Sequence, residues 1–265
     1  MMWASGILCM AFVLFLMLRF SILLPPVKGL PVLLYHKMSD SAEDNLTIRP
    51  QTFERQLLYL HEKGYQTISM RQLLAFMEAG SPLPQKPVMI TFDDGYVNNL
   101  KLACPLLEKY ACKAVFFIPS GGIGKTSFWD TNAEPLMSED QLKSIDPAFV
   151  EFGLHSAVHR NYRHCTARQI DADIEENISA LKNRGIPFAP AFAYPYGGRP
   201  KDKATYKSMT ESFSRTGIKL AFRIGNRVNR LPLKSPFEVK RISIRGTDSL
   251  WTFKTKLTKG RVKQV

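Results

Sequence analysis

The stretch Val88–Gly95 reads VMITFDDG, an apolar run that ends in two acidic residues and a glycine. A short apolar run bounded by turn residues is typical of a strand buried on both faces, as in a parallel sheet. Two carboxylates directly after such a strand are costly to bury unless they are paired or bound to something. Asp93 and Asp94 therefore indicate either a functional site at the strand end or an ordinary Asp-Gly turn.

Similar apolar runs recur along the chain and alternate with helical patterns. Besides Val88–Phe92, the expected strands are Pro31–Tyr35, Ala114–Ile118, Val150–Gly153, Phe188–Ala193, Leu220–Ile224 and Val239–Ile244. The expected helices are Thr52–Lys63, Met70–Ala79, Asn99–Tyr110, Ser138–Ser144, Thr166–Arg184 and Lys203–Thr216. This alternation indicates an α/β fold of mainly parallel strands with helical crossovers. Its length favours a barrel of (β/α) units over an open sheet.

The composition of the chain is that of a globular protein. Of its 265 residues, 45% are hydrophobic and 22% charged, which excludes a disordered chain, and four cysteines exclude a disulfide-built miniprotein. The net charge is +13, and residues 199–265 alone hold 18 Lys or Arg against 4 Asp or Glu. Such a basic region attracts nucleic acid, anionic lipid or a phosphorylated substrate, or it is an ordinary solvated surface.

The composition of residues 1–26 predicts a membrane anchor. Residues 2–24 carry Arg19 as their one charge and are long enough to span a bilayer core of about 30 Å. The absence of a basic start and of a small-residue cleavage site argues against a cleaved signal peptide. We therefore expect a single-pass protein of the bacterial inner-membrane type, with residues 27–265 as the catalytic domain. The basic residues that follow the segment favour a cytoplasmic catalytic domain.

Four of the expected strands end in polar side chains, at the place where such folds carry their chemistry. They end in His36, in Asp93 and Asp94, in HSAVH at 155–159, and in YPYG at 194–197. A spacing of four residues places both imidazoles of HSAVH on one face of a helical turn. Two imidazoles and one carboxylate suit a divalent transition metal and leave positions open for water and substrate.

Together these residues resemble a known family. TFDDG at 91–95 and HSAVH at 155–159 are similar to the first two motifs of the polysaccharide deacetylases with the NodB-homology domain, carbohydrate esterase family 4. FAYPYG at 192–197 resembles a variant of the third motif. The resemblance extends from about residue 30 to residue 251. It implies a deformed (β/α) barrel with fewer than eight complete units, and metal-dependent hydrolysis of an N-acetyl group on an amino sugar.

The resemblance also implies a role for each motif residue. Asp94, His155 and His159 would hold one divalent metal ion, usually zinc. Asp93 would be the general base that deprotonates the attacking water. The backbone N–H of Tyr196 would help to stabilise the oxyanion. Tyr194 is also expected to contact substrate. Trp129, which lies outside the motifs, either stacks on a sugar ring or packs within the fold.

Two positions depart from the family pattern. Ala193 stands where family members commonly have an Arg that orients the catalytic Asp, so that another residue, Arg241 or Arg199, must orient Asp93. No histidine occurs late in the chain, where the general acid of the family typically lies. His36 resembles the early acid His of the branch that includes exopolysaccharide poly-N-acetylglucosamine deacetylases, and we expect it to protonate the leaving amine.

The favoured prediction is a membrane-anchored, metal-dependent N-deacetylase. Its substrate would be a cell-envelope polysaccharide or a lipid-linked glycan, membrane lipid would be a second partner, and nucleic acid is not expected. The basic portion 199–265 would hold the site against the membrane, which favours a lipid-linked or membrane-proximal glycan. The alternative is a catalytically weak glycan-binding homologue, which the missing motif-three Arg favours. A basic nucleic-acid or phospholipid binder would leave the Asp and His motifs unexplained.

Overall fold

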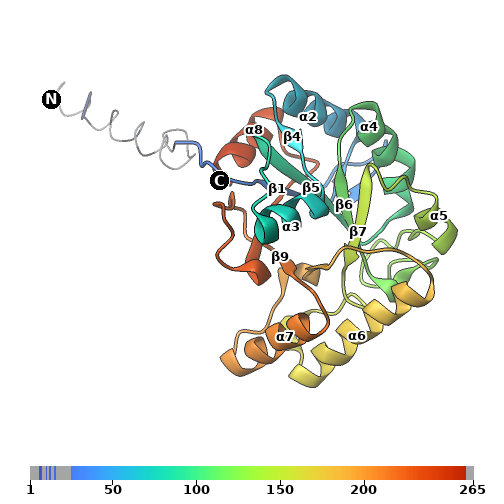
Figure 1. Ribbon diagram of the computed structural model, residues 1–265. Helices are drawn as coiled ribbons and strands as arrows, with labels where there is room; N and C mark the ends of the chain where they lie inside the picture. The colour runs from blue at the N-terminus through green and yellow to red at the C-terminus, as the bar shows by residue number, and fades with distance from the viewer. Residues whose placement is uncertain (1–5, 8–9, 11, 13–14, 16–24, 261–265) are drawn as a thin grey trace.

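The computed structural model describes residues 25–260 and, before them, residues 6, 7, 10, 12 and 15. In this part of the chain seven parallel strands form a closed barrel surrounded by helices (Figure 1). In order around the barrel they are β1 (Val32–Tyr35), β10 (Val239–Ser243), β9 (Leu220–Ile224), β8 (Ala191–Ala193), β7 (Val150–Leu154), β6 (Ala114–Ile118) and β5 (Pro87–Asp93), which pairs with β1. The expected barrel with fewer than eight units is confirmed.

Three short strands lie outside the ring. β4 (Gln66–Thr67) pairs with the start of β5, and β2 (Lys37–Met38) pairs with β3 (Thr47–Ile48) directly after β1. The amide of Met38 donates a hydrogen bond of 3.0 Å to Oδ1 of Asn98, which lies beyond β5. The chain after β1 is thereby held beside the end of β5.

Helices occupy the crossovers between the strands, and the last described helix follows β10. They are α2 (Pro50–Glu62), α3 (Met70–Ala79), α4 (Cys104–Lys109), α5 (Glu139–Lys143), α6 (Ala167–Asn183), α7 (Lys203–Arg215) and α8 (Leu250–Lys259). Ser69, Ser138 and Thr166 each form a capping box, which satisfies amides that have no partner in the first helical turn. A π-helical turn, Asn99–Ala103, precedes α4, so the predicted helix Asn99–Tyr110 is divided in two. The sequence patterns did not predict α8.

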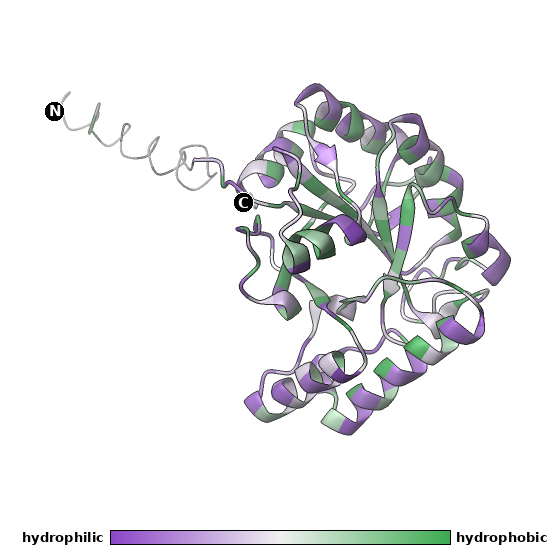
Figure 2. Cartoon of the chain, viewed as in Figure 1, coloured by the Kyte–Doolittle hydropathy of each residue, from purple (hydrophilic) through white to green (hydrophobic). Residues whose placement is uncertain are grey.

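The barrel has an inner and an outer core, because side chains alternate along each strand. Val32, Met89, Phe117 and Phe222 belong to the buried inner cluster, whereas Phe92 belongs to the outer cluster between strands and helices. Figure 2 shows the apolar colours on the strands and hydrophilic colours along the outer faces of the helices.

The helix α3 closes the barrel at the end where the strands begin. Its residues Met70 and Leu73 are buried in the inner cluster. The amide of Met70 donates a hydrogen bond of 2.5 Å to the carboxylate of Glu151, near the start of β7. The opposite end of the barrel, at the carboxyl ends of the strands, is left for the polar groups described below and is called the mouth.

The predicted anchor, residues 1–26, lies almost entirely outside the described residues and stays a prediction. No helix within the described residues is long and apolar enough to cross a bilayer. In the described chain the buried hydrophobic core begins at Leu30, and the Val27 amide donates a hydrogen bond of 2.8 Å to the carbonyl of Thr258. The barrel therefore closes and builds its core within residues 27–260.

Candidate active site and metal centre

Strand alternation explains why polar residues from distant parts of the sequence meet at the mouth. On β5, Asp93 is in phase with the inward-facing Met89, and after β1 His36 is in phase with Val32. Residues that share this phase point to the barrel interior. Arg241, the third residue of β10, has the same inward phase and is completely buried. The barrel thus aims these side chains at one volume.

The two adjacent aspartates face different partners because the chain turns between them. Asp93 ends β5, and the next residues, Asp94 and Gly95, have φ angles of 75° and 72°. A left-handed φ is uncommon for a residue other than glycine, although Asp adopts it more readily than most. Asp93 consequently faces Arg241, whereas the Asp94 carboxylate turns toward the histidines.

Asp94, His155 and His159 form a compact buried group. Nε2 of His159 lies 3.0 Å, and Nε2 of His155 lies 3.3 Å, from Oδ1 of Asp94. One ligand atom from each of the three residues lies within 4.8 Å of the others. The structure therefore brings together the three residues that the motifs predicted as metal ligands.

The prediction that His155 and His159 share a helical turn is wrong. Residues 155–161 form a non-helical loop in which Ser156 and His159 have φ angles of 67° and 53°. The two imidazole centroids nevertheless lie 5.0 Å apart. Two left-handed residues bend the loop so that both rings face Asp94, an arrangement that the spacing alone does not reveal.

The loop that carries both histidines is held by Asp173, a buried residue of α6. Its carboxylate accepts hydrogen bonds from the Ser156 hydroxyl at 3.1 Å, the Ala157 amide at 3.2 Å and the Tyr162 hydroxyl at 2.7 Å. Sequence reasoning missed Asp173 because it resembles one of several acidic residues on an amphipathic helix. Its importance lies in contacts that only the folded chain creates.

The hydrogen bonding of this group fits a bound cation. Nδ1 of His155 lies 2.8 Å from the carbonyl oxygen of Ala193, which can only accept, so Nδ1 carries the hydrogen. In the neutral ring, Nε2 then presents a lone pair toward Asp94. Oδ1 of Asp94 and Nδ1 of His159 are buried without a hydrogen-bond partner among the described residues. Lone pairs that converge with no hydrogen-bond donor between them suit a metal ion. The carbonyl of Ala193 fixes the orientation of the His155 ring through its other nitrogen.

The charge state of Asp94 agrees with such a ligand role. Burial raises the pKa of its carboxyl group, but the imidazoles of His155 and His159 outweigh this and hold the pKa well below its usual range. Metal ligands must be deprotonated to bind. Asp94 is therefore ready to bind a cation as a carboxylate.

Arg241 is the residue that orients Asp93. Its guanidinium donates two buried hydrogen bonds, from Nη1 to Oδ1 at 2.5 Å and from Nη2 to Oδ2 at 2.7 Å. Burial raises the pKa of Asp93, but the positive charge of Arg241 and the nearby His155 lower it more, so the net shift is downward. The other candidate, Arg199, is paired with Glu238 at 2.5 Å. Arg241 thus takes the place of the motif-three Arg that Ala193 replaces.

His36 lies at the mouth, beside Asp93. Its Nε2 is 4.0 Å from Oδ2 of Asp93, and its backbone carbonyl accepts a hydrogen bond of 2.7 Å from Nδ2 of the buried Asn99 side chain. Burial lowers the pKa of His36, against the opposing attraction of Asp93 and Asp94. The side chain is 16% exposed, so it can reach a substrate that enters the mouth.

Tyr96 and Asp130 extend the polar network behind Asp94. The Tyr96 hydroxyl lies 3.0 Å from Oδ2 of Asp94 and 2.6 Å from Oδ2 of Asp130. Burial and the two carboxylates raise the pKa of Tyr96, so its hydroxyl keeps its proton. Nζ of the buried Lys37 lies 3.1 Å from Asp130 and balances its charge. The tyrosine directly after TFDDG was the sequence signal for this network, and it lies outside the motifs.

Aromatic rings surround His159. Trp129 stacks on its imidazole with the ring centroids 4.3 Å apart, and Tyr196 meets it edge-on at 4.7 Å. Tyr196 is 56% exposed and has a φ of 57°. Phe128, in edge contact with Trp129, is 59% exposed. These rings form an aromatic rim beside the mouth.

The prediction that the Tyr194 side chain contacts substrate is not supported by its position. The ring is completely buried against Phe192 and Phe213, and its hydroxyl donates a hydrogen bond of 3.1 Å to the carbonyl of Phe237. Inward and outward residues alternate along the strand, and Tyr194 follows the inward-facing Ala193. Tyr194 therefore packs the outer core.

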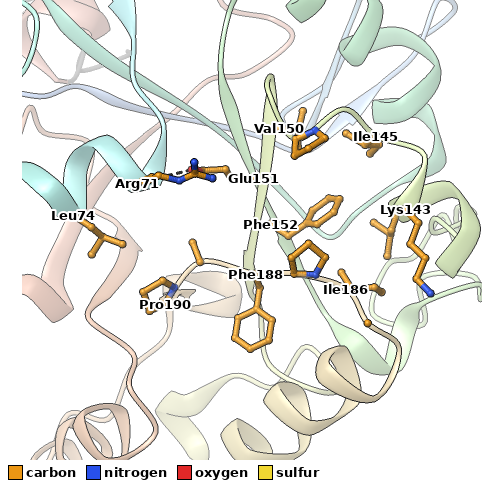
Figure 3. A pocket seen from close by; sticks show the side chains of 15 residues that line it. Arg71, Leu74, Lys143, Ile145, Val150, Glu151, Phe152, Ile186, Phe188 and Pro190 are labelled. Carbon is orange, nitrogen blue, oxygen red and sulfur yellow. Dashed lines mark hydrogen bonds and ion pairs between the residues drawn. The ribbon is translucent and has the colours of Figure 1, made fainter.

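A mostly apolar cavity of about 500 Å³ lies at the other end of the barrel (Figure 3). It contains the side chains of Phe152 and Phe188, and the ion pair of Arg71 with Glu151 lies on its border. In the described barrel β7 and β8 pair at a single position, which leaves the two strands apart where they begin. No aspartate or histidine lines this cavity, so it is not part of the candidate site.

The chain is similar to known proteins in both sequence and fold. The sequence profile described as polysaccharide deacetylase matches residues 80–212, half of the chain. The poly-β-1,6-N-acetyl-D-glucosamine N-deacetylase of Staphylococcus epidermidis is 25% identical over 187 residues, which cover 67% of this chain and 61% of that protein. The chain spans less than two thirds of the length of the curated relatives that it matches first.

Two solved structures have a similar fold. IcaB from Ammonifex degensii superposes with a TM-score of 0.73 at 23% identity, covering 88% of this chain and 97% of that one. The Streptococcus pyogenes deacetylase PplD, solved in complex with acetate, gives a TM-score of 0.72 at 21% identity, covering 88% of this chain and 99% of that one. At this level of identity the likeness concerns the fold.

Proposed function

The chain belongs to the polysaccharide deacetylase family, and we propose that it is a metal-dependent N-deacetylase of an N-acetylated amino sugar in a polysaccharide. One observation carries the proposal: the Asp94, His155 and His159 group lies beside Asp93, which Arg241 holds as a carboxylate. The first group suits a divalent metal, and zinc is the ion we propose for two imidazoles and a carboxylate. The second suits a general base.

Each polar group of the mouth has a separate task in amide hydrolysis. A bound divalent ion would polarise the acetamide carbonyl and lower the pKa of water. Asp93 accepts the proton of the attacking water, while Arg241 keeps its two oxygens in place. The backbone N–H of Tyr196 donates to the developing oxyanion. His36 gives a proton to the nitrogen as the C–N bond breaks, and the products are acetate and the free amine.

The proposed substrate is a polymer of N-acetylglucosamine of the kind named for the Staphylococcus epidermidis relative. The aromatic rim supports this choice, because exposed rings such as Tyr196 and Phe128 offer flat apolar faces to the sugar units next to the reacting one. A lipid-linked sugar has the same reactive group, and acetate release from each substrate distinguishes the polymer from the lipid-linked sugar.

The membrane context is a further part of the proposal. The composition of residues 1–26 supports a single-pass anchor of the bacterial inner-membrane type for a catalytic domain of residues 27–265. The basic residues that follow the apolar segment favour the cytoplasmic side. The alternative of a catalytically weak glycan-binding homologue rested on the missing motif-three Arg, and the contact of Arg241 with Asp93 removes that reason.

The test is acetate release by metal-loaded full-length protein in detergent. We expect release from β-1,6-linked N-acetylglucosamine oligomers and less from a lipid-linked N-acetylhexosamine. Asp93→Asn should keep its metal and lose about 10²–10⁴-fold in kcat, as expected when a general base is removed. Arg199→Met is the control, since Arg199 pairs with Glu238 and not with Asp93.

The role of His36 has a separate test. His36→Ala should retain metal and lose about 10²-fold or more on an N-acetyl sugar. On an activated ester, whose leaving group needs no proton, the same variant should be close to the parent. Oligomer binding without any acetate release by the parent would support the glycan-binding alternative instead.

A further inference from the structure

A basic groove lies on the barrel away from the mouth. It is a cavity of about 560 Å³ formed by residues 227–235, the start of β10, Val27 and Lys259. Its lining includes the cationic residues Arg227, Arg230, Lys234, Lys240 and Lys259. The one acidic residue in the lining is Glu238, and this carboxylate already pairs with Arg199 and Arg223.

Four of these cations have no counter-charge among the described residues. Within the described part of the chain, no carboxylate lies at ion-pair distance from Arg227, Arg230, Lys234 or Lys240. Elsewhere basic residues are commonly paired, as Lys219 is with Glu78 and Arg215 with Asp171. Unpaired cations gathered around one cavity produce a local positive potential that attracts an anion from outside.

The groove is firmly built. Asn229, which is buried, donates from its side-chain amide to the carbonyls of Leu30 at 3.1 Å and Lys240 at 2.8 Å. Its Oδ1 accepts the amide of Lys240 at 2.8 Å. The side-chain amide of Asn229 thus ties the loop to the chain before β1 and to β10. The cationic side chains project from a fixed frame.

The groove lies at the opposite end of the barrel from the mouth. It borders the chain before β1 and the start of β10, whereas Asp93 and His36 follow the ends of parallel strands. Leu30 and His36 are six residues apart along extended chain, roughly 20 Å at the strand rise per residue. Val27, in the groove wall, is the residue through which the apolar stretch 2–24 joins the barrel.

We propose that this groove binds the phosphate of anionic membrane lipid headgroups. Arginine offers paired N–H donors that match phosphate oxygens, and lysine adds a point charge. The lipid source follows from position, because 23 residues that carry one charge end just before the groove, and Arg261 and Lys263 follow it in the sequence. The proposal concerns a surface separate from the catalytic mouth and does not depend on the reaction.

Binding to the membrane through the groove determines which way the mouth faces. With the beginnings of β1 and β10 against the bilayer, the mouth opens away from it. A glycan polymer can then enter the mouth without approaching the membrane. This orientation differs from the expectation that the basic portion holds the site against the membrane, and it favours a polymer over a lipid-linked sugar.

Vesicle flotation of residues 25–265 tests the proposal. This fragment contains the whole described core of the barrel, so we expect it to fold without the apolar segment. At low salt it should float with vesicles that contain phosphatidylglycerol. With pure phosphatidylcholine vesicles it should stay unbound at the bottom of the gradient. The triple change Arg227→Gln, Arg230→Gln and Lys234→Gln should weaken partitioning on the order of 100-fold, since each cation contributes a factor of about 5 near an anionic leaflet.

A matched triple variant serves as control. Lys201→Gln, Lys203→Gln and Lys207→Gln remove the same charge near α7 and should reduce partitioning much less. Circular dichroism and acetate release serve to check that both variants fold. The proposal is overturned if the two variants lose affinity equally, or if the parent does not float with anionic vesicles. It is also overturned if duplex DNA or glycerol phosphate binds through the groove residues more tightly than the vesicles do.

Discussion

At the scale of single residues, Arg241 shows that the side chain that orients a catalytic carboxylate can come from a different strand than the motif predicts. Ala193 on β8 has no side chain to orient Asp93, and its carbonyl instead fixes His155. Arg241 reaches Asp93 from β10, two strands away, because both side chains point into the barrel. A short motif cannot contain such a partner, since 148 residues separate the two side chains.

Arg241→Met should leave the Asp93 carboxylate buried without its counter-charge. Removal of one partner of a buried ion pair destabilises a protein by about 3–5 kcal/mol. We expect a lower unfolding midpoint in urea and a large loss of kcat, with metal still bound at Asp94. Arg241→Lys should recover part of the stability and less of kcat, because lysine cannot make the paired hydrogen bonds. Parent-like kcat in Arg241→Met would contradict the orienting role.

Asp173→Asn should loosen the loop that holds both histidine ligands. The neutral amide weakens the hydrogen bonds to Ser156, Ala157 and Tyr162. Changes behind a metal ligand typically lower metal affinity about 10–100-fold, and we expect the lower end of this range. Competition with a chromophoric zinc chelator measures it. Asp171→Asn, which alters an exposed carboxylate paired with Arg215, should leave metal affinity unchanged.

Residue identities at strand ends were predictable from sequence, but their supporting contacts were not. The motifs identified Asp94, His155 and His159 because chemistry at strand ends requires these residue types at short spacing. Asp173 and Tyr96 act through contacts that form only when the barrel closes. Tyr194 was misplaced because its motif position suggests the mouth, whereas strand alternation turns it outward.

At the scale of elements, the loop between β6 and α5 joins the aromatic rim to the metal centre. Trp129 stacks on His159, and the next residue, Asp130, contacts Tyr96. Trp129→Ala should remove the packing that fixes the His159 ring, with a loss of metal affinity on the order of tenfold. Phe128→Ala changes the exposed neighbour and should leave metal affinity unchanged while raising KM. Equal metal affinities in the two variants would show that the stack does not position His159.

Element boundaries followed the sequence closely where side-chain periodicity was strong. The strands Ala114–Ile118 and Leu220–Ile224 and the helix Met70–Ala79 have the predicted bounds. The loop 155–161 was mistaken for a helical turn because spacing carries no information about φ. The short β8 begins later than predicted, since Phe188 and Pro190 border the cavity where β7 and β8 separate.

At the scale of the whole molecule, the cationic residues among 199–265 have several distinct roles. Arg241 neutralises the catalytic carboxylate, and Arg199 and Arg223 both meet Glu238. Lys256 is buried against Asp248. Arg227, Arg230, Lys234 and Lys240, for which the described residues offer no carboxylate partner, line the groove. Net charge alone therefore predicted attraction to anions but not its location, because burial and pairing depend on the fold.

Metal binding should stabilise the whole barrel, since its three ligands follow the ends of two strands, β5 and β7, that only the folded chain brings together. At free zinc 100 times the dissociation constant, the linkage amounts to about 2.7 kcal/mol. For a domain of this size we expect a rise in Tm of roughly 5–10 °C. His159→Ala should lose most of this rise, whereas His164→Ala, which alters an exposed histidine, should keep it. Differential scanning calorimetry measures both.

The proposed function requires that Asp94, His155 and His159 hold one metal ion on which hydrolysis depends, with Asp93 as the base. The most direct measurement is acetate release from β-1,6-linked N-acetylglucosamine oligomers during zinc titration of metal-free protein. We expect the rate to rise to a plateau at one zinc per chain, and no rise in Asp94→Ala. Full activity in protein shown by mass spectrometry to be free of metal, or a parent-like titration in Asp94→Ala, would contradict it.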